Sequence, residues 1–175
     1  PDCGPTLVDL FQQSAHPERI RVAVISQEEE DDRLMLPPEI ERFHPQIDVQ
    51  RFKASESKGV CWARHHGQQM LQQESFALQL DSHMRFEPGW DLLLLGTWVH
   101  CRDPRAVLTS YAPVHVAGRD RDSGAFFGMA AKEFTAEGIL LFTGRPRYAP
   151  GQARPEMPIK GAFVSAHFLF GPAEI

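Results

Sequence analysis

The feature that most constrains the fold is a short apolar segment that ends abruptly in three polar residues. Residues 76–80 have the composition of a buried strand, and Asp81, Ser82 and His83 follow directly. Alternate residues of an extended backbone share a face, so Asp81 and His83 point the same way if the strand conformation continues through the tripeptide. A carboxylate and an imidazole, completed by water or phosphate oxygens, suit Mn²⁺ or Mg²⁺ better than structural Zn²⁺. An ordinary strand-to-turn or helix-capping pair is the alternative interpretation.

The flanking segments both predict helices. Apolar residues recur at helical spacing over residues 60–71, and Pro88 and Gly89 precede a second helical segment from Trp90 to about His100. The tripeptide therefore lies between a strand and a helix, as in a βαβ unit. In open α/β sheets this carboxyl end of a strand is where ligands bind.

Alternation of strands and helices along the chain predicts an α/β fold with a mostly parallel open sheet and flanking helices. We expect one domain over residues 1–175, with Phe76–Asp81 as an interior strand and Ala162–Phe170 as the last core strand. The remaining expected elements are a helix at 5–15, strands at 20–26, 47–54 and 106–111, and edge strands at 125–131 and 139–143. A loop rich in proline and glycine is predicted at 144–158.

Composition and charge narrow the function classes. The 175 residues are 42% hydrophobic and 23% charged, which is ordinary for a globular domain. A net charge of −5 argues against nucleic-acid binding, which needs a basic field. It is compatible with a nucleotide sugar if a metal neutralises the diphosphate. No stretch is apolar enough to span a bilayer and no signal peptide is visible, so no membrane partner is expected.

The acidic run and the cysteines lead to two further expectations. The acidic residues 28–32 are interpreted as a solvated loop, because like charges repel and stay exposed. The three cysteines, Cys3, Cys61 and Cys101, fit neither a disulfide framework nor a zinc site. Cys61 is expected to be a buried thiol, and the set favours a reducing, cytoplasmic location.

Several segments of the chain resemble one enzyme family. Asp81-Ser82-His83, with an upstream Ala63-Arg64-x-x-Gly67 and a downstream Gly89-Trp90, is similar to the donor-site half of glycosyltransferases with the type A fold. The closer resemblance is to the N-acetylglucosaminyltransferases that modify hydroxyproline on a cytosolic protein, and to their bacterial relatives. It extends over the segments 61–64, 80–86, 88–91, 108–113 and 162–170.

This resemblance implies a Rossmann-like nucleotide-sugar transferase fold and a retaining transfer of N-acetylglucosamine from a uridine diphosphate sugar. Asp81 and His83 would hold the cation, and Arg64 would contact the diphosphate through its guanidinium fork. The family begins with a further nucleotide-binding strand and continues to an acidic motif, so the chain is expected to be incomplete at both ends. The acceptor would be a peptide or a glycan.

Other candidate residues keep their alternatives open. Arg85 either orients Asp81, contacts the acceptor or is an exposed loop arginine. His167 lies in an apolar segment and is either a core histidine or a contact to sugar, phosphate or metal. The adjacent His65 and His66 point about 100° apart on a helix, so packing is favoured over a ligand pair.

Two other function classes compete with transfer. A non-catalytic relative or fragment would bind nucleotide or glycan without turnover. A metal-dependent phosphate-ester hydrolase would usually need more carboxylates close together than Asp81 alone provides. Activity assays with nucleotide sugars would discriminate between these classes.

Overall fold

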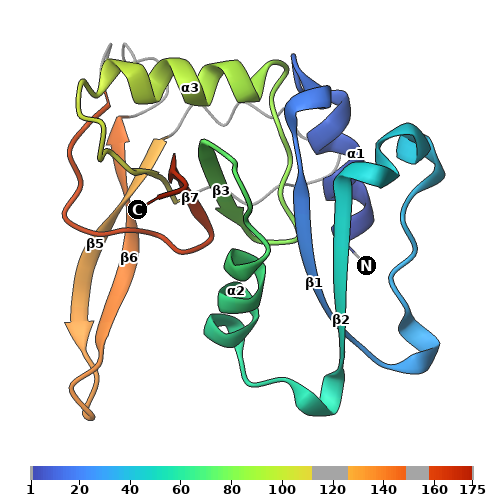
Figure 1. Cartoon of the computed structure of the whole chain (residues 1–175). Helices are drawn as coiled ribbons and strands as arrows, with labels where there is room; N and C mark the ends of the chain where they lie inside the picture. The colour runs from blue at the N-terminus through green and yellow to red at the C-terminus, as the bar shows by residue number, and fades with distance from the viewer. Residues whose placement is uncertain (1, 112–125, 149–157, 175) are drawn as a thin grey trace. The chain divides into compact units, whose positions relative to one another are not determined.

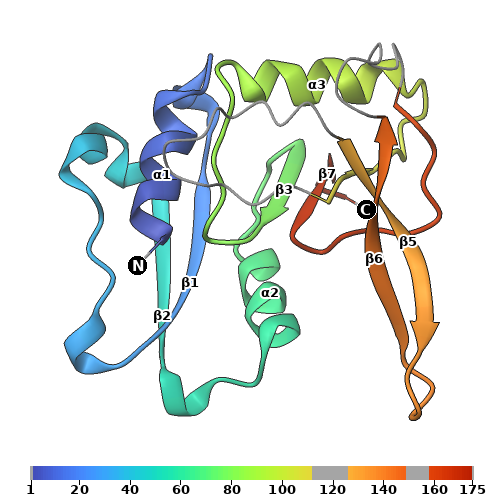
Figure 2. The same ribbon diagram turned by 180° about the vertical axis from the view of Figure 1, so that it is seen from behind.

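The computed structural model describes residues 2–111, 126–148 and 158–174 (Figures 1 and 2). The chain forms two compact units, and each is described by itself. Unit 1 comprises Pro1–Glu74 and Arg85–Leu92, and unit 2 comprises Ser75–Met84 and Leu93–Ile175. The single domain expected over residues 1–175 stays a prediction.

The sheet of unit 1 is a parallel pair, β1 (Val22–Glu28) and β2 (Ile47–Lys53). Its register runs from Val22 opposite Ile47 to Glu28 opposite Lys53. Parallel neighbours need a long crossover, and here residues 29–46 supply it with two short 3₁₀ helices, η2 (Glu30–Asp32) and η3 (Pro38–Gln46). The strands predicted at 20–26 and 47–54 are thus confirmed within two residues at each end.

Helix α2 (Val60–Gln69) follows β2 in unit 1 and contacts β1. Gly59 stands immediately before it with φ of 89°, a left-handed conformation that a residue with a side chain adopts only under strain. The helix predicted at this place is confirmed. Short 3₁₀ helices η1 (Pro17–Arg19) and η4 (Ala54–Glu56) complete the unit.

The core of unit 1 forms between helix α1 (Cys3–Gln12) and η3. Leu7, Leu10 and Phe11 of α1 are buried, as are Ile40 and Phe43 of η3. The rings of Phe11 and Phe43 are stacked, with centroids 4.6 Å apart. Burying a side chain of this size contributes about 1.5–3 kcal/mol, so the aromatic pair is a main support of the unit.

The segment Arg85–Leu92 is fixed to α1 by hydrogen bonds. The backbone N–H of Phe86 donates to the Asp9 carboxylate, and the N–H of Gly89 donates to the Gln13 carbonyl. The indole N–H of Trp90 donates to the Leu10 carbonyl at 2.9 Å. Trp90 thereby connects this segment to α1.

The main sheet of unit 2 contains β3 (Phe76–Leu80), β7 (Phe168–Pro172) and β4 (Leu108–Thr109), in that order. Strand β7 runs antiparallel to both neighbours, so β3 and β4 share one direction. Helix α3 (Trp90–His100) lies between β3 and β4 in the sequence, as a βαβ connection requires.

The predicted sheet was wrong in two respects for the described residues. Only β1 and β2 are parallel neighbours, and β3 lies at an edge of its three-stranded sheet instead of in its interior. The reason is the insertion of β7 between β3 and β4. What the structure establishes is a mixed α/β architecture with several small sheets.

The core of unit 2 is aromatic. Phe170 of β7 is 6% exposed, and its ring stacks on that of Phe76 at 5.4 Å between centroids. The edge of Trp98 from α3 meets Phe76 at 4.9 Å. Gly171 allows β7 to lie close to the segment that precedes β4. A Cβ at this position would lie only 3.2 Å from the Ala106 carbonyl oxygen, which is tighter than ordinary van der Waals contact.

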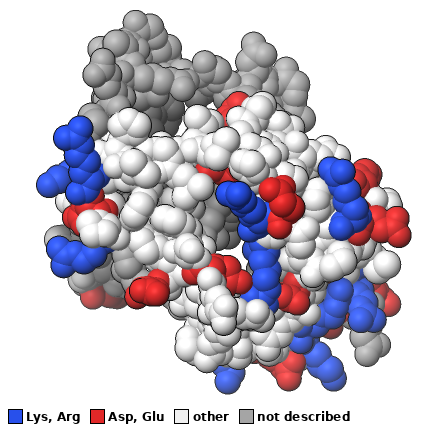
Figure 3. All heavy atoms as spheres, turned by 45° about the horizontal axis from the view of Figure 1, so that its top comes forward, with Lys and Arg blue, Asp and Glu red and all other residues white. Residues whose placement is uncertain are grey.

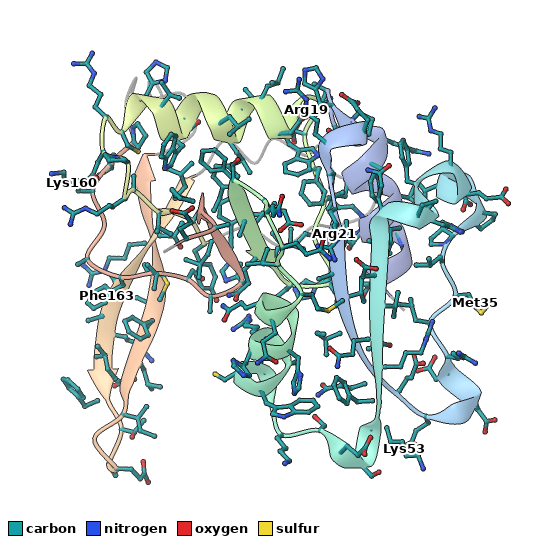
Figure 4. The ribbon with its side chains drawn as sticks, viewed as in Figure 1. Arg19, Arg21, Met35, Lys53, Lys160 and Phe163 are labelled. Carbon is teal, nitrogen blue, oxygen red and sulfur yellow. The ribbon has the colours of Figure 1, made fainter. Side chains whose placement is uncertain are left out.

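Strands β5 (Phe126–Phe134) and β6 (Leu140–Tyr148) form an antiparallel hairpin with a register shift between Ala131 and Glu133. The edge strands predicted at 125–131 and 139–143 are confirmed as strands, but they pair with each other as a separate two-stranded sheet. Phe163, labelled in Figure 4, meets Phe142 of β6 at 5.0 Å between ring centroids. The loop predicted at 144–158 is wrong for residues 144–148, which belong to β6, and residues 149–157 lie outside the described residues.

Charged side chains of both signs are interspersed on the face shown in Figure 3. Arg21, labelled in Figure 4, donates to the carboxylates of Asp48 and Glu74 at 2.6 and 2.8 Å. Among the described helices, none combines the length and the apolar character needed to cross a membrane.

The acidic run contains one residue that is not simply solvated. The Glu28 carboxylate accepts hydrogen bonds from the Ser26 hydroxyl and the Leu34 N–H, and it pairs with Arg51. These contacts, with the Ser26 hydroxyl first, lower the pKa of Glu28 to about 2. The expectation was wrong for Glu28, while Glu29, Asp31 and Asp32 are exposed as predicted.

Candidate functional site

The Asp-Ser-His tripeptide lies directly after β3 in unit 2. The strand ends at Leu80, and Ser82 and His83 form a turn. Asp81 is half-buried, whereas Ser82 and His83 are exposed. The extended backbone assumed for the tripeptide is therefore wrong, because Asp and Ser favour a turn at this point. Strand alternation no longer argues for a shared face, and cation binding by Asp81 and His83 stays a prediction.

The topology brings a distant residue to Asp81. In the antiparallel pairing of β3 with β7, Leu80 lies opposite Phe168. Asp81 directly follows Leu80 and His167 directly precedes Phe168, so both residues leave the sheet beside this last pair. The carboxyl end of β3 and the amino end of β7 thus meet at one edge of the sheet.

The end of β4 reaches the same edge from the other side of β7. Thr109 pairs with Leu169, and Tyr111 follows two residues later. The Tyr111 ring meets that of His167 in an edge-to-face contact, with centroids 4.9 Å apart. His167 therefore lies between the ends of β3 and β4.

His167 does not lie within a strand. The predicted strand Ala162–Phe170 is wrong for its first half, because β7 begins at Phe168 and residues 166–167 form a turn. The Ser165 hydroxyl lies 2.5 Å from His167 Nδ1. The turn at residues 166–167 produces this proximity.

The described residues contain no group of three or more His, Cys, Asp and Glu side chains arranged to hold a metal ion. A cation at Asp81 and His83 would draw its other ligands from water or from the phosphates of a substrate. One carboxylate and one imidazole fit that kind of open site for Mn²⁺ or Mg²⁺. The donor set is thus compatible with the expected ion.

The two candidate arginines belong to unit 1. Arg64 is half-buried on α2. Arg85 donates from its guanidinium to the Thr6 hydroxyl at 3.2 Å, so one of its contacts is with α1. The roles of Arg64 and Arg85 toward a substrate stay predictions.

Other residues of α2 have packing or surface positions. The His66 ring lies 4.9 Å from that of Phe52 and 4.5 Å from that of Trp62, which confirms the packing interpretation, and His65 is exposed. Cys61 was expected to be buried but is exposed. The three cysteines are free thiols.

Sequence reasoning missed one anchoring residue, Asp91. Its carboxylate accepts hydrogen bonds from the Ser14 hydroxyl and from the backbone N–H groups of Ala15 and His16, each at 2.8 Å. Burial raises the pKa of Asp91, but these hydrogen bonds outweigh it and hold the pKa below its usual value. The only signal in the sequence was the position of Asp91 in the first turn of a predicted helix, where a carboxylate is favoured.

Comparison with known proteins gives one positive result. A family model described as Glycosyltransferase (GlcNAc) matches residues 36–175, and this range includes every candidate residue, namely Arg64, Asp81, His83, Arg85 and His167. No curated protein and no solved structure matches the chain. The match extends over well more than half of the sequence and agrees with the resemblance carried by its motifs. The chain belongs to the Glycosyltransferase (GlcNAc) family.

Proposed function

We propose that the chain carries the donor site of a metal-dependent, retaining glycosyltransferase that transfers N-acetylglucosamine from a uridine diphosphate sugar to an acceptor hydroxyl. Family membership supports sugar transfer in general. The observation that carries the finer proposal is the sheet edge of unit 2. There Asp81 follows the last paired residue of β3, and His167 precedes the first paired residue of β7. The exposed His83 lies two residues after Asp81.

Asp81 and His83 are the residues that would hold Mn²⁺ or Mg²⁺. When bound, such an ion supplies Lewis-acid neutralisation of the charge that develops on a diphosphate leaving group. Asp81 is half-buried and directly follows a strand, so the sheet anchors the backbone that carries its carboxylate. His83 is exposed in the following turn and is accessible to a ligand from solvent.

The remaining residues would orient the donor and acceptor. His167 would donate a hydrogen bond to a phosphate or sugar oxygen, because it precedes Phe168, whose partner Leu80 precedes Asp81. Arg64 would contact the diphosphate, where a guanidinium matches two oxygens at once. Arg85 would act toward the acceptor, a peptide or glycan hydroxyl.

The test is a calorimetric titration of the chain with uridine diphosphate N-acetylglucosamine, with and without Mn²⁺. We expect binding that depends on Mn²⁺ and that weakens at least tenfold in Asp81→Asn and His83→Ala. Asp103→Asn and His100→Ala are matched controls, because both are exposed residues of the same unit. They should bind like the wild type.

Two results would contradict the proposal. Unchanged Mn²⁺-dependent affinity in both Asp81→Asn and His83→Ala, with the fold intact by circular dichroism, would exclude this metal site. Metal-dependent binding with neither sugar transfer nor slow donor hydrolysis would favour a non-catalytic binding module. Release of uridine diphosphate, followed with the anomeric configuration of the product by NMR, separates these cases.

A further inference from the structure

A buried hydroxyl contacts the ring of His167. Ser165 is 4% exposed, and its Oγ lies 2.5 Å from His167 Nδ1. On its other side the His167 ring meets Tyr111, which is 45% exposed. The imidazole is thus held by a buried polar group and a partly exposed aromatic ring.

The backbone of this turn is fixed independently of that contact. The Ser165 N–H donates to Thr109 Oγ1 at 2.8 Å, and the Thr109 hydroxyl donates to the Phe168 carbonyl at 3.0 Å. From β3, the Gln79 amide donates to the Ala166 carbonyl at 2.9 Å. Both neighbouring strands therefore hold the turn, and the Ser165 hydroxyl is not needed to keep its backbone in place.

We propose that Ser165 is a positioning residue that sets the tautomer and the orientation of His167 for the sugar donor. This inference rests on the proposed function. In this proposal the Ser165 hydroxyl, which lies 2.5 Å from Nδ1, donates to that nitrogen, and the ring proton then resides on Nε2. A nucleotide sugar presents phosphate, hydroxyl and carbonyl oxygens, and a neutral imidazole can donate to an oxygen only from its protonated nitrogen. Ser165 thereby makes Nε2 the donor and fixes its direction.

Loss of the hydroxyl should affect donor binding more than folding. Ser165→Ala removes one neutral hydrogen bond, so we expect donor affinity to fall about three- to tenfold. Ser165→Thr keeps a hydroxyl and should retain most of the affinity. Ser110→Ala, a change at a half-buried serine that follows β4, is the matched control and should bind like the wild type.

The experiment combines two readouts on the full chain. Nitrogen-15 NMR of labelled histidine reports which ring nitrogen of His167 carries the proton, with the signal assigned by its loss in His167→Ala. Calorimetry with uridine diphosphate N-acetylglucosamine and Mn²⁺ gives the affinity of wild type, Ser165→Ala, His167→Ala and the double variant. We expect a proton on Nε2 in the wild type, a tautomer mixture in Ser165→Ala, and no additional loss in the double variant.

Either of two outcomes would overturn the proposal. One is an unchanged His167 tautomer in Ser165→Ala, and the other is an equal affinity loss from Ser165→Ala with and without His167. A wild type that binds no nucleotide sugar would refute the proposed function instead, and the tautomer measurement would still decide whether Ser165 controls the ring. If Ser165→Ala fails to fold, the Ser165→Thr and Ser165→Cys pair gives the same comparison of strong and weak hydrogen bonding.

Discussion

Replacing Asp91 with asparagine tests whether the segment Arg85–Leu92 depends on one carboxylate. In the wild type, Oδ1 accepts from the Ala15 N–H, and Oδ2 accepts from the His16 N–H and the Ser14 hydroxyl. Asparagine keeps one acceptor oxygen and places an NH₂ group where the second oxygen was. The Ser14 hydroxyl can turn to accept from it, but a backbone N–H cannot.

The expected cost follows from these contacts. One hydrogen bond to a charged acceptor contributes roughly 1.5–3 kcal/mol. Asp91 is only half-buried, so water replaces part of this loss, and we expect destabilisation of about 1–2 kcal/mol. For a chain of this size that corresponds to a fall in melting temperature of about 2–8 °C.

The assay is thermal unfolding followed by circular dichroism as a function of pH. Because the pKa of Asp91 is lowered in the folded state, its stabilisation is present above about pH 4 and is lost as the pH falls below that. The difference between wild type and Asp91→Asn should therefore shrink as the pH falls below about 4. Asp103→Asn is the control, because the Asp103 carboxylate accepts only within its own exposed turn, from Arg105 N–H. Equal melting temperatures for wild type and Asp91→Asn at pH 7 would refute the reasoning.

Two further predictions concern charged residues of unit 1. The pKa of Glu28 is about 2 in the folded chain against about 4.5 in the unfolded chain, so its stabilisation is complete above pH 5 and is lost as the pH falls toward 2. Glu28→Gln should flatten the acid limb of a stability–pH curve, whereas the exposed neighbour variant Glu29→Gln should leave it unchanged; identical curves for all three proteins would contradict this. Arg64→Ala should weaken nucleotide-sugar affinity about ten- to a hundredfold if its partner is a phosphate, with only partial rescue by Arg64→Lys. A lower melting temperature with unchanged calorimetric affinity would instead make Arg64 structural.

Segments with strong local signals were predictable from the sequence. The strands β1 and β2 are short runs rich in β-branched and apolar residues, and α3 begins after a Pro-Gly pair. In each case the information lies within about ten residues, so periodicity and turn chemistry suffice. The parallel pairing of β1 with β2 agrees with the mostly parallel sheet that the alternation of strands and helices predicts.

Strand order in unit 2 was not predictable in the same way. Whether β7 adds at an edge or inserts between β3 and β4 depends on partners far away in the sequence. The apolar character of Phe168–Phe170 fits either place, because both bury the segment. Gly171 lets β7 lie close to Ala106, as the insertion requires. An isolated glycine near the end of a strand is, however, equally typical of a turn.

The same insertion of β7 changes which residues lie at the sheet edge beside Asp81. An extended strand through residue 83 would have placed Asp81 and His83 on one face, but β3 ends at Leu80. A parallel sheet would gather only strand carboxyl ends at the edge where Asp81 lies. An antiparallel strand inserted there contributes its amino end instead, and so His167, which directly precedes β7, reaches the same edge as Asp81. The sheet edge acquires a histidine whose ring contacts the Ser165 hydroxyl, while Thr109 holds the Ser165 backbone. The positions of Ser165 and Thr109 at this edge depend on strand order and not on any local motif.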